Sequence, residues 1–413
     1  MSKHDRLNIL VLSDLHAHSG DPNSSASPSH LSTNSLYSDP MSNPLADVVG
    51  LLEAKGLSAD WVMTPGDLGD RADPVAQKFA WAELDAIKTR VGAQYLFGTA
   101  GNHDLDSRRN FPDHDPKSAL QLLNPTFPLA CDLFEMQDGV YSDRYWSRNF
   151  VIVPFDDFDC TLLILNSSAF HGYSSDATTP PNEHLRGKIS PLTLDAIRAG
   201  LASRKTKLNI VLVHHHLVRH PWIDDAGSHM IGGDKLIEAL KQTGRQWLVI
   251  HGHQHVPGLS YADSSSIAPV VLSAGSVAAK TYMVRGVHSR NQVHHVSIDL
   301  GAMDPSGAEL LGSITTWTWA LGTGWREATA DGGLPNECGF GYRPAALDMR
   351  NRLIAATKAN PNKVLRWSEA VAIEPKLKYL VPEDLKHVLS LIENSGAVVD
   401  RDRYDMPRQL ECQ

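Results

Sequence analysis

The chain has 413 residues, of which 42% are hydrophobic and 21% charged, so it can form one large domain with additions or two domains. Its formal net charge of −9 argues against a generally basic surface for nucleic acid. The four cysteines are widely spaced without a C-x-x-C pair, which argues against a disulfide framework or a cysteine zinc site. No run approaches the length of a membrane span and no signal-peptide pattern follows Met1, so we expect a cytoplasmic protein that does not enter a membrane.

Short apolar runs alternate with helical patterns in the first hundred residues. The predicted elements are strand 7–12, helix 44–55, strand 59–64, helix 75–90 and strand 93–99. This order predicts right-handed β-α-β crossovers and a largely parallel inner sheet. The segment 17–44 is rich in Ser, Pro, Asn and Asp, and it is either a plain surface loop or a loop that borders a functional site.

The middle of the chain continues this alternation. Two β-rich runs, 150–153 and 161–165, flank the acidic turn 156–159 and predict a hairpin. Ser190-Pro191 predicts the start of a helix, with a capping hydroxyl and proline at the first position. The elements expected beyond it are strand 208–213, helix 233–243, strand 246–250 and closing strands at 269–272 and 292–298.

The character of the sequence changes after about residue 305. Three tryptophans between 317 and 325 lie in a Gly/Thr-rich, β-like stretch, and helical patterns follow at 344–358 and 382–394. We therefore expect a main domain over 1–304 and a C-terminal extension over 305–413. The extension carries no catalytic pattern, so a lid, an oligomerisation element and a partner-binding module all remain open.

Metal-ligating residue types follow the strand-like runs directly. They stand in five motifs, Asp14-x-His16, Gly66-Asp67, Gly101-Asn102-His103-Asp104, His214 and Gly252-His253-x-His255. The glycines let the backbone turn tightly and approach bound ions. The expected ligands are Asp14, His16, Asp67, Asn102, His214, His253 and His255. This mixture of oxygen and nitrogen donors suits Mn²⁺, Fe²⁺ or Zn²⁺. Seven donors exceed what one tetrahedral zinc can use, so we expect two ions with the Asp67 carboxylate as their bridge.

Two divalent ions about 3.5–4 Å apart can clamp a phosphoryl group and stabilise both oxygens of an in-line displacement. They also lower the pKa of a bound water, so that hydroxide forms near neutral pH. His103 is not needed by either ion, and at the edge of the site it could protonate the leaving oxygen. Asp104 is expected to orient that imidazole. His215 and His216 compete with His214, which we prefer because it directly follows the predicted strand.

In their order, the five motifs resemble the calcineurin-like metallophosphoesterase superfamily, over roughly residues 7–300. Gly187-Lys188-Ile189-Ser190 and Gly275-Ser276 also look like segments of that family. The resemblance implies a β-sandwich of two mixed sheets flanked by helices, whereas the residue pattern by itself would equally fit one doubly wound sheet. It further implies one ion held by Asp14, His16, Asp67 and His255, a second held by Asp67, Asn102, His214 and His253, and His103 as the catalytic histidine.

Relatives in that superfamily cleave phosphoproteins, cyclic nucleotides, glycerophosphodiesters, nucleotides or DNA. We expect a phosphodiesterase in which a metal-bridging hydroxide attacks in line, with two divalent ions (Mn²⁺, Fe²⁺/Fe³⁺ or Zn²⁺) as cofactors. A DNA or RNA nuclease is the main alternative, because Arg108-Arg109 and Arg285 to Arg290 could form a local basic track. A phosphomonoesterase and an inactive binding or scaffold relative are further alternatives. The expected partners are a phosphate-ester substrate, either a small nucleotide or nucleic acid, and a second copy or another protein bound through 305–413.

Overall fold

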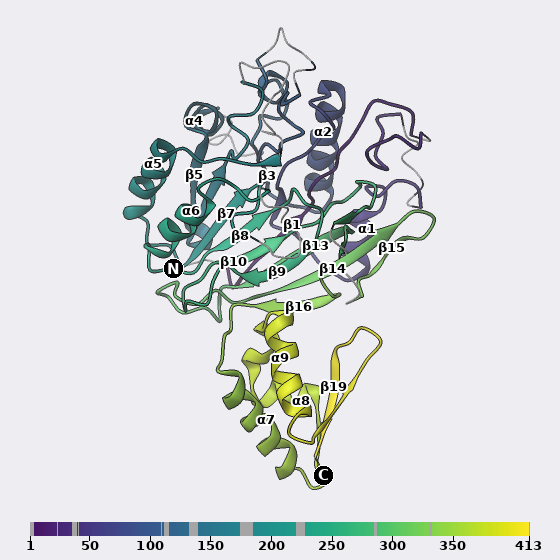
Figure 1. Ribbon diagram of the computed structural model, residues 1–413, viewed down its shortest axis with the longest axis vertical. Coiled ribbons are helices and arrows are strands. Elements are labelled where there is room, and N and C mark those ends of the chain that lie inside the picture. The colour runs from purple at the N-terminus through teal and green to yellow at the C-terminus, as the bar shows by residue number, and fades with distance from the viewer. Residues whose placement is uncertain are drawn as a thin grey trace.

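Two large mixed sheets face one another in the main body of the protein, and a smaller unit carries the C-terminus (Figure 1). The computed structural model describes residues 4–22, 24–34, 39, 41–108, 110, 115–131, 139–173, 185–219, 228–284, 287–329 and 333–412. Parts of the expected loop 17–44 and of the expected basic track lie outside the described residues, namely 23, 35–38, 40, Arg109 and Arg285.

The first sheet contains the N-terminal strand and three later strands that the sequence placed in a separate extension. Its strands are β1 (Arg6–Val11), β2 (Trp61–Thr64), β3 (Tyr95–Gly98), β4 (Leu129–Cys131), β13 (Asn291–Asp299), β14 (Gly312–Ala320), β15 (Gly324–Glu327) and β16 (Glu337–Phe340). They follow the order β15-β14-β13-β1-β2-β3-β4, and β16 pairs with β14. β1, β2 and β3 are parallel, as the β-α-β pattern predicted, whereas β13 runs antiparallel to β1.

The second sheet has the order β5-β6-β7-β8-β10-β9. Its strands are β5 (Phe150–Phe155), β6 (Cys160–Leu165), β7 (Leu208–Val213), β8 (Leu248–His251), β9 (Gly258–Tyr261) and β10 (Val270–Ser273). β5 and β6 are antiparallel around a 3-10 turn at Asp156–Phe158, which confirms the expected hairpin. Two helices, α5 (Pro191–Ala202) and α6 (Gly233–Lys241), lie beside this sheet (Figure 1). A short hairpin, β11 (Met283–Val284) and β12 (Val287–His288), lies outside both sheets.

Alternating residues of β7 divide the interior into two cores. Leu208, Ile210 and Leu212 belong to the main core between the sheets. Val211 and Val213 belong to a second core with apolar residues of α5 and α6. Both faces of the strand are therefore buried, which is why its sequence is continuously apolar. This layering confirms the two-sheet sandwich, and a single doubly wound sheet does not describe the fold.

Further helices are α1 (Val48–Ala54), α2 (Pro74–Arg90), α3 (Ser118–Gln121) and α4 (Val140–Arg148). Helix α2 contacts β2 and β3 of the first sheet, whereas α4 contacts β5 of the second sheet. Asp73 caps α2 by accepting hydrogen bonds from the amides of Val75 and Ala76. The sequence did not predict α4, because its residues are mostly polar and Tyr145 is its one fully buried side chain among those described.

The C-terminal unit has its own core and its own three-stranded sheet. Its elements are α7 (Ala346–Ala359), β17 (Val364–Arg366), α8 (Trp367–Ile373), a 3-10 turn at Pro375–Tyr379, α9 (Pro382–Glu393), β18 (Val398–Arg401) and β19 (Pro407–Glu411). The antiparallel strand order is β17-β19-β18. Because β14 to β16 belong to the main sheet, this unit begins after residue 340 and not at the expected boundary at 304.

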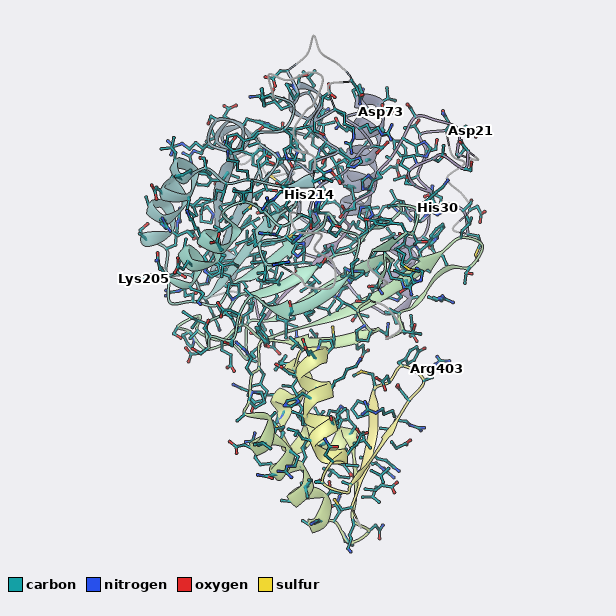
Figure 2. All side chains as sticks on the ribbon, viewed as in Figure 1. Asp21, His30, Asp73, Lys205, His214 and Arg403 are labelled. Carbon is teal, nitrogen blue, oxygen red and sulfur yellow. The ribbon has the colours of Figure 1, made fainter. Side chains whose placement is uncertain are left out.

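Side-chain contacts fasten the C-terminal unit to the main body. Tyr379 donates a hydrogen bond to Asp299, and Lys376 pairs with Glu309 at 2.7 Å. The Tyr404 hydroxyl donates to Glu327 at the edge of the main sheet, beside Arg403, which Figure 2 labels at this junction. No helix in the described parts of the chain is long and apolar enough to cross a membrane.

Candidate metal centre

The seven expected ligands lie together just beyond the ends of strands from both sheets. Asp14 and His16 follow β1, Asp67 follows β2 and Asn102 follows β3. His214 follows β7, and His253 and His255 follow β8. Because β1, β2 and β3 are parallel, as are β7 and β8, their carboxyl ends meet at one edge of the sandwich.

The backbone at this edge takes an uncommon conformation. A positive φ occurs at Asp14 (51°), His16 (47°), Asp67 (54°), His253 (82°) and His255 (55°). A left-handed backbone is rare for residues other than glycine, and such residues gather at functional sites. These turns aim the donor side chains at a common point, instead of alternating them as an extended strand would.

Four donors form the first set. Ligand atoms of Asp14, His16, Asp67 and His255 all lie within 4.8 Å of one another. The Nε2 atoms of His16 and His255 are 2.9 Å apart, and the same atom of His16 lies 3.5 Å from Oδ2 of Asp67. At most one hydrogen fits between these two nitrogens, and the carboxylates add only lone pairs. Such a surplus of acceptors fits a bound cation.

The second set is built around His214. Its Nδ1 lies 2.9 Å from the carbonyl oxygen of Pro65, which can only accept, so the ring hydrogen is assigned to Nδ1. Burial lowers the pKa of His214, which leaves Nε2 without a proton near neutral pH. That nitrogen faces Oδ1 of Asn102 at 2.9 Å and Oδ2 of Asp67 at 3.4 Å. Three lone pairs therefore converge with no hydrogen between them, and a cation satisfies all three.

His253 completes the second set and joins it to the first. Its Nδ1 lies 2.9 Å from the same Oδ1 of Asn102, while Nε2 lies 3.3 Å from the carbonyl oxygen of Leu185. Its backbone amide donates to Oδ1 of Asp14 at 3.0 Å. Asp67 and Asp14 thus connect the two sets, which is the geometry expected of a pair of ions with a carboxylate between them.

Burial dominates the electrostatics of the site. It lowers the pKa of His16 and of His253 well below the ordinary range, and neighbouring imidazoles add to both effects. The pKa of Asp67 is raised by burial and by the nearby carboxylates of Asp14 and Asp104. The imidazoles of His16 and His253 are therefore neutral at pH 7, and the buried carboxylates need a positive charge beside them.

Two glycines of the motifs are required by close approaches. A Cβ atom on Gly101 would lie 2.1 Å from Oδ1 of Asp67, and one on Gly252 would lie 2.1 Å from Oδ2 of Asp14. Any side chain at either position would displace a donor carboxylate. These two glycines therefore let the backbone come close to the donor carboxylates.

His103 lies on the rim of the first set, where its ring centroid is 4.6 Å from that of His16. Its Nδ1 is 2.7 Å from Oδ1 of Asp70, and its Nε2 is 3.2 Å from Nη2 of Arg108. Burial, followed by the positive charge of Arg108, lowers the pKa of His103 well below the ordinary range. The ring is therefore neutral in the free protein, with its hydrogen on the side of Asp70.

The prediction that Asp104 orients His103 is wrong. The Asp104 carboxylate accepts hydrogen bonds from four backbone amides, those of Asp67 (2.7 Å), Leu68 (2.7 Å), Gly69 (3.3 Å) and Gly101 (2.8 Å). It is fully buried, and the His103 imidazole contacts Asp70 instead. Asp104 instead holds the Gly66-Asp67 and Gly101-Asn102 turns together, which fixes the positions of two expected ligands.

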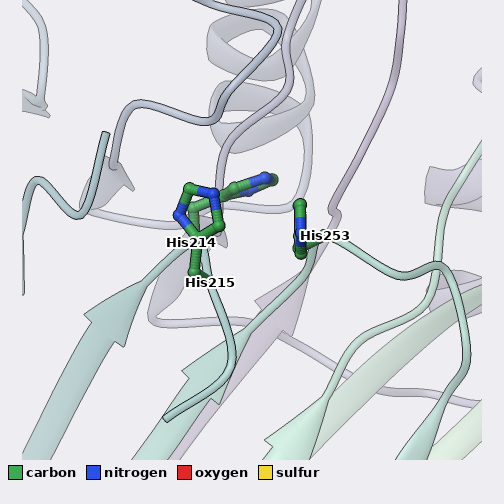
Figure 3. A group of neighbouring side chains, drawn as sticks. All are labelled: His214, His215 and His253. Atoms are coloured by element: carbon green, nitrogen blue, oxygen red, sulfur yellow. The ribbon is translucent and has the colours of Figure 1, made fainter. Parts of the chain in front are cut away.

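His215 and His216 lie beside the second set and make contacts of their own. His215 shares a hydrogen bond of 2.8 Å with Ser167 through Nδ1, and His216 lies 3.3 Å from the hydroxyl of Ser228. Figure 3 shows His214 and His215, at the end of β7, together with His253 across from them. Ligand atoms of His214, His215 and His253 lie within 4.8 Å of one another, and His214 also contacts Asn102 and Asp67, which supports it as the ligand.

Sequence reasoning missed Asp70 as the partner of His103 and considered Arg108 only as part of a basic track. A signal for Asp70 was present, because it is a second carboxylate three residues after Asp67 in a glycine-containing turn. Arg108 carried no local pattern. Its Nη1 is buried without a hydrogen-bond partner among the described residues, so the guanidinium keeps a donor for an anion at this edge.

Two buried donor sets at the strand ends of a β-sandwich define a metal-binding hydrolytic centre. A family model for calcineurin-like phosphoesterases matches residues 7–257, which is 251 of the 413 residues. The chain therefore belongs to the calcineurin-like phosphoesterase family, and it is a hydrolase that acts on phosphate esters. The His and Asp clusters fit a dinuclear site for divalent metal ions.

Solved structures with a related chain path include a dimetal phosphatase from Danio rerio, with 12% identity, 75% of this chain and 95% of that chain covered, and a TM-score of 0.47. A purple acid phosphatase from yellow lupin (Lupinus luteus) has 12% identity, coverage of 76% and 52%, and a TM-score of 0.43. Comparison with curated proteins gave no match. A second family model, wHTH-Calcineurin_assc, matches residues 338–394.

Proposed function

We propose that this chain is a phosphodiesterase that uses two divalent cations. One is held by Asp14, His16, Asp67 and His255, and the other by Asp67, Asn102, His214 and His253. The observation that carries the proposal is that two buried donor sets share Asp67, with His103 on their rim and its side chain 20% exposed. A substrate at this rim would contact both donor sets and the imidazole together.

When bound, the cations supply an activated water and Lewis-acid stabilisation of the phosphoryl oxygens. The chain supplies the positions. The His253 amide donates to Oδ1 of Asp14 at 3.0 Å, and the His103 amide donates to Oδ1 of Asp67 at 2.7 Å, so both carboxylates are held in place. Arg108 contacts His103 through Nη2, and its buried Nη1 has no partner among the described residues, so a non-bridging phosphate oxygen beside His103 would accept from this guanidinium.

His103 is placed to give a proton to the leaving oxygen. Asp70 holds Nδ1, so Nε2 faces the rim beside Arg108. In the free protein the imidazole is neutral, but an anionic phosphate beside it raises its pKa and favours protonation of Nε2. Arg108 can then release the ring to bind the phosphate, and the proton passes from Nε2 to the leaving group as the ester bond breaks.

The test is hydrolysis of bis(4-nitrophenyl) phosphate by the purified full-length chain with added Mn²⁺. We expect turnover that a chelator abolishes and that added Mn²⁺ restores. Asp67→Asn should lose both activity and metal, because the two donor sets share this carboxylate. Asp143→Asn, on the exposed face of α4, is the matched control and should behave as the native chain. Activity that survives both chelation and Asp67→Asn would contradict the proposal.

A nuclease is the main alternative, and a phosphomonoesterase is the second. Rates on 4-nitrophenyl phosphate, a cyclic nucleotide, a glycerophosphodiester and single- or double-stranded DNA separate these three. The formal charge of −9 weighs against extended nucleic-acid binding. If long DNA is cleaved faster than short oligonucleotides and small diesters, and its KM rises steeply with salt, the nuclease replaces the proposed phosphodiesterase.

We also propose that the C-terminal unit is a winged helix-turn-helix, with α8 and α9 as its helical pair. The match of residues 338–394 and the order helix, strand, helix, helix, strand, strand support this. In such units the second helix commonly reads nucleic acid. Here Leu385 and Lys386 of α9 line a cavity of about 660 Å³, and residues of β14 and β16 form its opposite wall. Because this face is directed at the main body, we expect no gel shift of duplex DNA by the native chain.

A further inference from the structure

A second polar cavity opens beside the metal centre. Its volume is about 440 Å³, and its lining includes His30, Arg290, Gln292, Thr318, Trp319 and Arg326. In the described part of its lining there are two arginines and no carboxylate. Arg326 is exposed, Arg290 is half-buried, and Trp319 is buried and forms a wall. The lining therefore offers hydrogen-bond donors and positive charge to an anion.

The register of the first sheet places this cavity on the same edge as the metal centre. Arg326 of β15 is paired with Thr318 of β14, and Thr318 with Gln292 of β13. Residues paired across antiparallel strands project from the same face, and the Gln292 amide does donate to the Thr318 hydroxyl at 2.9 Å. Two residues further into β13, His294 is paired with Val11, the last residue of β1. The row thus lies level with the loop that carries Asp14.

Main-chain hydrogen bonds tie the cavity wall to the ligand-bearing loops. The Arg290 amide donates to the carbonyl of His255 at 3.0 Å. The hydroxyl of Ser29, the neighbour of His30, donates to the carbonyl of His16 at 2.8 Å. A substrate bound at both the cavity and the metal centre would therefore lie along one continuous surface. The cavity residues on β14 and β15 lie two and three strand spacings from β1, which carries the Asp14 loop. At about 4.8 Å per spacing, the cavity and the metal centre are on the order of 10–15 Å apart.

We propose that this cavity, which we call the Arg326 subsite, binds a second phosphate of a substrate whose scissile ester lies at the metal centre. The inference rests on the proposed phosphodiesterase function and narrows its substrate to a molecule with phosphates on the order of 10–15 Å apart. The exposed guanidinium of Arg326 gives charge-assisted hydrogen bonds to phosphate oxygens. A linear oligonucleotide meets this requirement, whereas a small diester with one phosphate does not.

The experiment compares bis(4-nitrophenyl) phosphate with oligothymidylates that carry one, two, three or four phosphates. For the native chain we expect kcat/KM to rise once the oligomer is long enough to reach the subsite. In Arg326→Gln this gain should fall about tenfold, the effect of one charge-assisted hydrogen bond, while hydrolysis of bis(4-nitrophenyl) phosphate stays unchanged. Arg326→Lys should retain part of the gain, because it keeps the charge but not the planar fork.

Arg408→Gln is the matched control, because Arg408 is an exposed arginine of the C-terminal unit outside the cavity. A binding measurement separates this inference from the proposed function: fluorescence anisotropy of a labelled tetrathymidylate in the presence of chelator. Weaker binding by Arg326→Gln than by Arg408→Gln supports the subsite even if bis(4-nitrophenyl) phosphate is not hydrolysed. Equal behaviour of the two variants in both assays, or a gain with length that Arg326→Gln leaves intact, overturns it.

Discussion

Replacing Asp104 by asparagine should destabilise the fold, although this residue stands next to His103. Each Asp104 oxygen accepts from two amides, Oδ1 from Leu68 and Gly69 and Oδ2 from Asp67 and Gly101. In Asp104→Asn, whichever way the carboxamide lies, its NH₂ group faces two N–H donors. Two buried charge-assisted hydrogen bonds are then lost, at about 1.5–3 kcal/mol each, so the free energy of unfolding should fall by about 3–6 kcal/mol.

Urea unfolding followed by circular dichroism, with chelator present, measures this change. Asp70→Asn is the comparison variant, since Asp70 contacts His103 and its side chain is 16% exposed. It should unfold within about 1 kcal/mol of the native chain and lose about 10–100-fold in turnover, as partners of functional histidines commonly do. If Asp104→Asn is as stable as the native chain and only turnover falls, Asp104 acts through His103 and the assignment made from the amide contacts fails.

Three further outcomes test other parts of the site. His103→Gln should lower turnover of an alkyl phosphodiester by about 10²–10⁴-fold. Turnover of bis(4-nitrophenyl) phosphate should fall far less, because nitrophenolate leaves without a proton. Equal losses for the two substrates would contradict the role of His103 as the acid. Asn102→Ala should lose one of two bound Mn²⁺ ions in elemental analysis, whereas an unchanged metal content would remove Asn102 from the ligands. The third outcome concerns His294, which lies outside the metal centre and whose pKa burial lowers from 6.5 to about 4. As pH falls, the imidazole takes up a proton in the unfolded chain before it does so in the folded chain. The contribution of neutral His294 to the free energy of unfolding is therefore present above pH 6.5 and is lost as pH falls towards 4. Between about pH 7.5 and 5, the free energy of unfolding measured in urea should fall by roughly 2 kcal/mol more for the native chain than for His294→Gln.

The position of the ligands could be predicted from the sequence because two simple patterns coincide. Buried parallel strands give short, continuously apolar runs, and donor residues follow those runs directly. Val11 and Val213 end strands close to where the sequence placed them, so Asp14 and His214 fall at the same edge. A parallel arrangement brings such ends together whether they belong to one sheet or two. The residue pattern therefore predicted that the donors lie together, whereas the resemblance to the family predicted the two-sheet sandwich.

The pairing of His103 could not be predicted, because it depends on the path of a turn. Arg71 and Ala72, just after Asp70, have positive φ values of 52° and 58°, and the turn is held by the amide contacts of Asp104. No periodicity encodes such a path. The sheet membership of β14 to β16 was missed for a related reason, since antiparallel pairing with β13 is a long-range register that composition does not reveal.

The left-handed backbone at five donor positions lowers the stability of the fold at this edge of the sandwich. Each such residue costs about 1–2 kcal/mol, so the five together lower the free energy of unfolding by about 5–10 kcal/mol, against a net stability that is typically about 5–15 kcal/mol. Glycine at Asp14 or Asp67 would relax the backbone while removing a donor, so the inactive chain would be the more stable one in chelator. Cations that bound the folded chain and not the unfolded one would restore that stability by mass action. The same five donor residues thus lower the free energy of unfolding of the metal-free chain, and the concentration of metal would determine how much of it is restored.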